Sequence, residues 1–415
     1  MFYTSSNPIP RCLTRAIIRL VVVGAALSNC IAYAQKLPIP QNLPNNLQIH
    51  GFVSQSWLKS TDNNNVFGKS SSDSGSFDFR ELGLNASMRP KPNLQFSAQM
   101  ISRTAGKGSP GNIRFDYGFI DYAFLSEENS KIGIRLGRMK NPLGFYNDTR
   151  DVPFTRPSIL LPQSIYFDRT RKLGIAADGV HLYGEYRFEH GVLSFQGGPV
   201  RPLVRGAEAE VALLGQGMPG HLAPDISYIG RISYELDEGR LRFAVSGTNL
   251  NIDYDPASGD RLGAGSIRFT PLIFSAQYNA ERWSFTSEYA IRHFEYKNFG
   301  RAALNLDFFG ESYYLQGAYR ITPELEAIAR YDVLYTDSND RSGKKWAAAT
   351  GGDPHRRFAK DITVGLRWNV TPEFMLRAEY HRVNGTGWLS TLDNPNSGDL
   401  SPHWNLFSIL GSYRF

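Results

Sequence analysis

The feature that most constrains this chain is a strict alternation of apolar and polar residues that returns along its length. In residues 362–370, for example, Ile362, Val364 and Leu366 share one face, while Thr363 and Arg367 lie on the other. Successive side chains point to opposite faces only in a strand, so this period predicts β-structure. Sixteen segments read in this way: 47–58, 77–88, 94–103, 113–125, 131–140, 178–188, 191–198, 226–236, 240–250, 265–279, 282–296, 308–321, 324–336, 360–370, 373–383 and 404–415.

The connections between these segments alternate in length. Seven are short turns, at 90–93, 127–130, 189–190, 237–239, 280–281, 322–323 and 371–372, whereas the others are mostly long, polar and rich in Gly, Asn and Ser. A soluble β-sandwich shares the alternation within strands. Short turns at one end and long loops at the other are instead typical of transmembrane barrels.

Aromatic residues near the strand ends resemble the interfacial aromatic belts of membrane proteins: Tyr331, Tyr335, Trp368, Tyr380, Trp404 and Tyr413. Lipid offers no hydrogen bonds to a free strand edge, so the sheet must close. We therefore predict an all-β protein, a transmembrane antiparallel up-and-down β-barrel of sixteen strands with both termini on the periplasmic side. Eighteen strands stay open as an alternative, because segment 265–279 changes phase at Pro271, which predicts a bulge.

The N-terminus predicts export. Three arginines in residues 11–19 precede the apolar run 20–27, and Ala32 and Ala34 form an A-x-A cleavage site. We expect a signal peptide at 1–34, a short lead at 35–46 and the barrel at 47–415. Cleavage removes both cysteines, Cys12 and Cys30, and leaves 42 basic and 39 acidic residues of the 45 and 39 in the full chain. Such a small net charge, without a basic cluster, argues against nucleic-acid binding.

The polar strand faces are predicted to line a water-filled pore, because a charge turned to lipid at mid-depth costs about 2–4 kcal/mol. The charged candidates are Asp121, Arg135, Arg187, Arg231, Arg242, Glu288, Arg292, Arg320, Arg330, Asp332, Arg367, Arg377 and Glu379. Arginine dominates from the eighth strand to the fifteenth, with neighbouring acids that offset much of it. A modest preference for anions follows, and replacing Arg330 and Arg367 with Ala is expected to reduce it.

The longest loop, residues 141–177, is predicted to narrow the pore. Its apolar run 159–161 favours folding inward against the barrel wall, with an external loop covering a subunit contact as the alternative. Eight charged residues of this loop are expected to act on selectivity at the constriction: Arg150, Arg156, Arg169, Arg171, Lys172, Asp148, Asp151 and Asp168.

Three short motifs carry a resemblance to a known family: 136–144 (LGRMKNPLG), 49–52 (IHGF) and 79–84 (FRELGL). They are similar to motifs in the phosphate-selective group of Gram-negative outer-membrane porins and its relatives. The last strand, with alternating aromatic residues and a terminal Phe415, resembles the signature read by the barrel-assembly machinery. The resemblance implies passive diffusion through a homotrimer in contact with outer-membrane lipid and lipopolysaccharide. Phosphate selectivity does not carry over, because loop 141–177 mixes charges of both signs.

We therefore expect a porin for small hydrophilic solutes, weakly anion-preferring, without cofactor, metal or catalytic site. The alternative is a channel specific for one anion, sugar or aromatic solute, in which Phe115, Tyr117 and Phe119 would form a binding track with Tyr166 and Phe167 of the loop. An adhesin or structural anchor fits less well, because sixteen strands leave an aqueous channel. No Gly-x-Ser-x-Gly or His-Glu-x-x-His motif supports an enzyme.

Overall fold

The computed structural model describes residues 46–204, 206–300 and 305–415, and its strands form one continuous antiparallel sheet. The predicted signal peptide and the lead up to residue 45 lie outside the described residues. The strands are β1 (Leu47–Ser60), β2 (Ser76–Lys91), β3 (Leu94–Ala105), β4 (Ser109–Ser126), β5 (Ser130–Lys140), β6 (Ala176–Arg187), β7 (Gly191–Pro202), β8 (His221–Pro224), β9 (Ser227–Leu236), β10 (Leu241–Asp255), β11 (Gly265–Asn279), β12 (Trp283–Lys297), β13 (Leu306–Arg320), β14 (Leu325–Tyr335), β15 (Phe358–Asn369), β16 (Phe374–Gly385) and β17 (His403–Arg414).

The sheet closes on itself through the first and last strands. β1 pairs with β17 from Phe52↔Arg414 to Ser60↔Leu406, and every other neighbouring pair follows chain order. The short β8 pairs with the far end of β10, beyond the part that pairs with β9. β8 and β9 thus share one place in the wall, so the described chain forms a sixteen-stranded up-and-down barrel, as predicted. The alternative of eighteen strands is wrong.

All sixteen predicted strands occur, and β11 has the predicted bounds. The bulge predicted at Pro271 is wrong, because β11 keeps one register with β12 from Ser266↔Lys297 to Asn279↔Ser284. The register instead shifts in β2–β3, β3–β4 and β4–β5. The phase change in the sequence has another cause. Ile267 and Ile273 are buried inside the barrel against apolar neighbours, where a pore wall in contact with water would carry polar residues.

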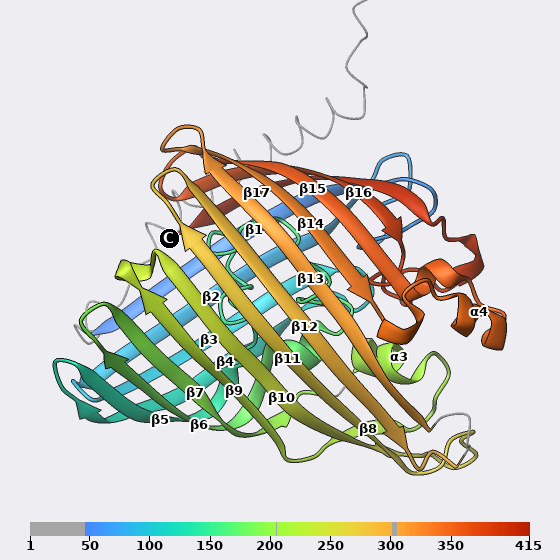
Figure 1. Cartoon of the computed structure of the whole chain (residues 1–415), viewed down its shortest axis with the longest axis horizontal. Helices are drawn as coiled ribbons and strands as arrows, with labels where there is room; N and C mark the ends of the chain where they lie inside the picture. The colour runs from blue at the N-terminus through green and yellow to red at the C-terminus, as the bar shows by residue number, and fades with distance from the viewer. Residues whose placement is uncertain (1–45, 205, 301–304) are drawn as a thin grey trace, which may run out of the picture. The chain divides into compact units, whose positions relative to one another are not determined.

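The two ends of the barrel differ in their connections (Figure 1). Tight turns and the C-terminus lie at one end. The opposite end carries the long loops, with the helices α2 (Arg171–Ile175), α3 (Ala207–Leu214) and α4 (Lys344–Thr350). The β3–β4 connection is an exception, because its strands extend until only residues 106–108 remain between them. None of the described helices is both long and apolar enough to cross a membrane.

The outer surface of the strands is apolar. On β15, for example, Ile362, Val364, Leu366 and Trp368 are each about half exposed. Similar residues occur on the outward positions of most strands, and an apolar band of this extent is far larger than a soluble monomer exposes. Trp404 corrects the predicted aromatic belt. It is buried, contacts Trp388 and donates its indole N–H to the Gly385 carbonyl at 3.0 Å, so it faces the interior.

Candidate functional site

The long segment after β5 lies inside the barrel, as predicted, and we call residues 141–175 the inner loop. Its residues contact strands on all sides of the wall, including β2, β3, β10, β12, β14 and β16. A single segment can touch opposite walls of a closed barrel only from within. The inner loop therefore crosses the lumen and narrows it, and its coil is visible within the ring of strands (Figure 1).

Gly144 fixes the point where the inner loop first meets the far wall. Its backbone N–H donates to Ser246 Oγ at 2.8 Å, and the N–H of Phe145 donates to Glu288 at 2.8 Å. Gly144 has φ +60°, and a Cβ there would lie 2.4 Å from the Tyr166 hydroxyl. Only glycine fits this backbone and this space. The glycine at the end of motif 136–144 is thus the residue that lets the loop dock.

A second anchor holds the middle of the inner loop against β14 and β16. Glu379 accepts hydrogen bonds from the backbone N–H groups of Ile159, at 2.5 Å, and Leu160, at 3.4 Å. Arg330 donates to Ser158 Oγ at 2.8 Å and to the Leu160 carbonyl at 3.0 Å. Ile159 and Leu160 are buried in the largest apolar cluster of the barrel, together with residues of β1, β2 and β14–β17. Burial of the 159–161 run therefore explains why the loop folds inward.

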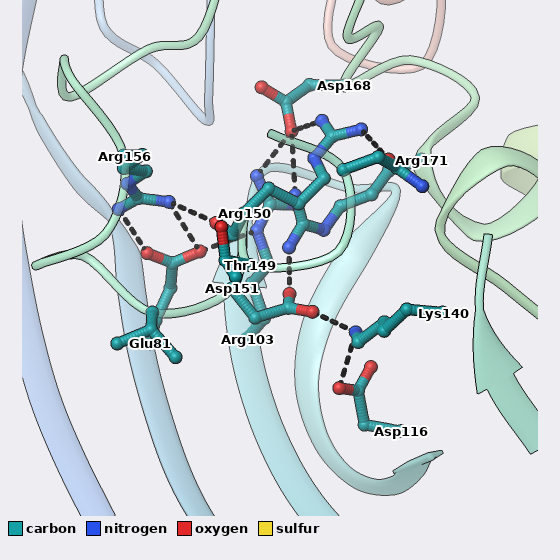
Figure 2. A network of polar contacts seen from close by, with 12 residues as sticks. Glu81, Arg103, Asp116, Lys140, Thr149, Arg150, Asp151, Arg156, Asp168 and Arg171 are labelled. Atoms are coloured by element: carbon teal, nitrogen blue, oxygen red, sulfur yellow. Dashed lines mark hydrogen bonds and ion pairs between the residues drawn. The ribbon is translucent and has the colours of Figure 1, made fainter. Parts of the chain in front are cut away.

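A network of buried ion pairs joins the inner loop to β2–β5 (Figure 2). Glu81 accepts from Arg156 at 2.6 Å and from Arg103 at 3.2 Å, and Arg103 also reaches Asp168 at 2.7 Å. Further along, Asp151 pairs with both Arg171 and Lys140, Lys140 pairs with Asp116 at 2.6 Å, and Arg150 lies 3.5 Å from Asp168. Five cations face four carboxylates, which leaves a single excess positive charge.

The network sets the ionisation of its loop members. Burial opposes the charge of Asp151, but Arg171 and Lys140 outweigh it and hold its pKa well below 3.8. Arg103, Arg150 and Arg171 lower the pKa of Asp168 against the same burial. Burial, together with the charge of Arg171, lowers the pKa of Arg150 to about 9. At neutral pH Asp151, Asp168 and Arg150 are therefore charged, and these loop charges are paired within the network rather than exposed to a passing ion.

The predicted pore residues divide into two groups. Glu288, Arg292, Arg330, Asp332, Arg377 and Glu379 are buried, and five of them bond the inner loop directly, as Arg377 does through the Arg156 carbonyl at 2.6 Å. Closer to the turn end, the remaining arginines are more exposed. Three of these form ion pairs across strands or to the loop: Arg135–Asp121 at 2.8 Å, Arg231–Asp148 at 2.6 Å and Arg242–Glu235 at 2.9 Å.

The other predicted residues lie apart from these pairs. Arg187 and Arg320 are exposed at the turn ends of β6 and β13, and Arg187 reaches Glu185 at 3.0 Å. Arg367 donates to Asn369 at 3.0 Å. Lys172 donates its backbone N–H to Glu208 at 3.1 Å, so it ties the inner loop to α3.

Arg169 differs from the other loop cations, because it forms no ion pair with a described residue. Its guanidinium lies 5.5 Å from the centre of the Phe167 ring. Burial and the nearby charge of Arg357 lower the pKa of Arg169 to about 10. Arg292 approaches the same ring at 5.1 Å. Two cations that lack a carboxylate partner thus meet at Phe167.

Three residues of the network, Arg103, Asp116 and Lys140, were not among the residues predicted from the sequence. Arg103 follows the alternation of Gln95, Ser97 and Gln99 in its own strand, so the pattern contained the signal. Asp116 lies close to a register shift between β3 and β4, which breaks the period that would have placed it. Lys140 is the last residue of β5 and lies inside motif 136–144. Alternation along a strand does not show which way its last side chain points, so the sequence pattern gave Lys140 no role.

The aromatic track of the solute-specific alternative is not continuous. The rings of Tyr117 and Phe119 lie with their centres 5.9 Å apart, but Phe115 does not join them. Phe115 is 44% exposed and lies below Arg138, whose ion pair with Asp178 is also exposed. Tyr166 is buried and donates to Glu288 at 2.6 Å. A register shift beside Phe115 interrupts the alternation of β4, so Phe115 does not share a face with Tyr117 and Phe119.

One group of potential metal ligands occurs among the described residues. His293 lies 2.7 Å from Asp307, with Glu295 nearby. Glu295 already pairs with Lys297 at 3.0 Å and with Arg268 at 3.3 Å. The cations neutralise this carboxylate, so we assign no metal to the group.

The fold is that of the outer-membrane porins. The outer-membrane channel DcaP of Acinetobacter baumannii has a TM-score of 0.55 at 12% identity, covering 89% of this chain and 97% of that one. An anion-selective porin from Comamonas acidovorans has a TM-score of 0.52 at 12% identity, covering 89% and 99%. The trimer form of OmpT from Vibrio cholerae has a TM-score of 0.53 at 12% identity, with the same coverage of 89% and 99%. No family model and no curated sequence matches the chain.

Proposed function

We propose that this protein is an outer-membrane diffusion channel for small hydrophilic solutes, narrowed by its inner loop. The inner loop bound inside a closed barrel is the observation that carries the proposal. The apolar outer band supports a membrane location, because in lipid every strand edge must be paired and every exposed face must be apolar. Structural likeness to porins supports the same conclusion.

Size exclusion and electrostatic bias are the proposed mechanism. The wall pairs Arg135–Asp121, Arg231–Asp148 and Arg242–Glu235 set opposite charges side by side. Arg169 and Arg367, which have no ion pair with a described residue, supply a positive surplus. A weak preference for anions follows, and no chemical step or cofactor is required.

Reconstitution in a planar bilayer under a salt gradient tests the proposal. We expect discrete conductance steps and a reversal potential displaced slightly toward that of the anion. Swelling of liposomes in sugars of increasing size would then measure the width left by the inner loop. Protein that migrates as a folded barrel on unheated gels, yet gives no conductance, would contradict the proposal.

We also propose that the channel is a homotrimer, as in the trimer form of the Vibrio cholerae protein. Conductance in groups of three steps, together with a trimer band on unheated gels, is expected. A folded protein that sediments as a monomer in detergent would contradict this assignment.

A solute-specific channel is the second candidate. One observation favours it: the inner loop contacts the wall on several sides, and its charges are mostly neutralised by partners rather than presented to the pore. Small conductance that one solute blocks at micromolar concentration would identify this function instead.

A further inference from the structure

A cavity of about 80 Å³ lies between the inner loop and the wall formed by β6, β7 and β9–β12. Most of its lining is apolar, with Leu143 and Leu173 from the loop, and Ile229, Phe269, Ile273 and Ala290 from the wall. This space holds several water molecules or one small ring. Water gains few hydrogen bonds from these apolar side chains, so this part of the lining favours an apolar group.

Four buried polar atoms of the same lining find no hydrogen-bond partner among the described residues. They are Asn141 Oδ1, Arg150 Nε, Ser164 Oγ and Arg292 Nε. Buried polar groups are nearly always bonded, so these four atoms leave hydrogen-bonding capacity unused beside the cavity. Three of the four can donate, and two belong to cations. An acceptor with negative charge would therefore suit the three donors, whereas Asn141 Oδ1 needs a donor.

Arg292 is the strongest of these donors. It is 4% exposed, and its Nη2 donates to the carbonyls of Tyr335, at 2.8 Å, and Glu311, at 3.3 Å. No described carboxylate forms an ion pair with it. A buried charge without a counter-ion is costly, so an anion that reached Arg292 would be held firmly. Arg150, by contrast, already shares Asp168.

We propose that this cavity binds a small organic anion, with its carboxylate at Arg292 and Ser164 and its apolar body, a single ring or a short branched chain, among the apolar side chains. The inference rests on the proposed channel, since it names the class of solute that the inner loop retains. Inorganic phosphate would leave the apolar lining uncovered. A neutral sugar would leave Arg292 without a counter-ion.

Calorimetric titration of the folded protein in detergent tests the site, with benzoate as the probe. Acetate keeps the charge without the ring, and benzyl alcohol keeps the ring without the charge. We expect benzoate to bind at least tenfold more tightly than either. Arg292→Gln should weaken benzoate binding at least tenfold, and Arg292→Lys should restore part of it. Ala290→Leu should abolish binding by filling the cavity.

Arg320→Gln is the matched control, because Arg320 is an exposed wall arginine at the turn end of β13. It should bind benzoate like the wild type. Each variant is first checked for the folded band on unheated gels. Absence of benzoate binding to the wild type, or an equal loss in Arg320→Gln, would overturn the site.

Bilayer conductance of the same preparations separates the two proposals. Normal conductance without benzoate binding overturns the site and leaves the channel. Benzoate binding without conductance overturns the channel and leaves the site.

Discussion

At the level of single residues, an arginine on the polar face of a strand either holds the inner loop or faces the pore. Arg330 is buried and bonds Ser158 and Leu160 of the inner loop. Arg367 lies one strand away and, among the described residues, its side chain bonds only Asn369. Both follow the same alternation in the sequence. What separates them is whether the inner loop covers them.

This difference predicts different outcomes for two alanine variants. Arg367→Ala should move the reversal potential toward that of the cation and change stability by less than about 1 kcal/mol, because it removes a partly solvated charge. Arg330→Ala should mainly destabilise the loop, by about 3 kcal/mol or more, because two charge-assisted hydrogen bonds are lost. Reversal potential and thermal unfolding, measured on both variants, check the prediction. Equal effects of the two changes on both measurements would contradict it.

At the level of elements, ion pairs and buried apolar side chains hold the inner loop against the barrel wall. Asp151 and Asp168 bond cations from both the loop and the wall. Because their pKa values are lowered on folding, they stabilise the anchored loop at every pH above their unfolded pKa. That stabilisation is lost only as the pH falls through the lowered, folded values.

The loop is therefore expected to stay anchored from neutral pH down to about pH 4, near the ordinary aspartate pKa of 3.8. Current noise from loop motion should increase only below that value, as the pH falls toward the lowered pKa values of Asp151 and Asp168 and these two carboxylates are protonated. Single-channel noise recorded over this range measures the effect.

Asp151→Asn provides the reference for that titration. This substitution removes the carboxylate that pairs with both Arg171 and Lys140. Loss of one partner of a buried ion pair destabilises the folded state by about 3–5 kcal/mol. The current noise of the variant channel should therefore already be high at neutral pH. Wild-type noise that increases near pH 6, or a quiet Asp151→Asn channel, would contradict the anchoring role.

At the scale of the whole molecule, the barrel depends on the seam between its first and last strands. Gly51 and Phe415 exchange two backbone hydrogen bonds, of 3.1 and 3.0 Å. A Cβ at Gly51 would lie 2.4 Å from the Phe415 ring, so the seam is closely packed there. The ring itself is 59% exposed on the outside.

Phe415→Ala should separate assembly from stability. The two backbone bonds of the seam remain and an exposed ring is lost, so the unfolding temperature of the purified protein should hardly change. Its level in the outer membrane of cells should fall severalfold if the terminal Phe recruits the assembly machinery. Equal levels of wild type and variant would contradict that role, and a large loss of thermal stability would show a structural role instead.

The positions of the strands, their order and the closure of the barrel follow from the pattern of the amino-acid sequence. Period-2 alternation and loop length are local properties, and lipid allows them only one closed arrangement. The sequence also placed the long loop and its apolar run 159–161, whose burial drives the loop inward. The absence of a bulge at Pro271 and the inward side chain of Trp404 were not predictable in this way, because each depends on what lies opposite the residue.

Which lumen charges face water and which hold the inner loop depends on contacts in the folded protein. A strand pattern gives the face of Glu379, Arg330 or Glu81, but not its partner, which comes from a segment distant in sequence. The cavity beside Arg292 is likewise invisible in the sequence, since its lining residues come from six strands and one loop. Alternation is set by the backbone, whereas ion pairing and cavities are set by contacts that exist only once the loop is folded inside.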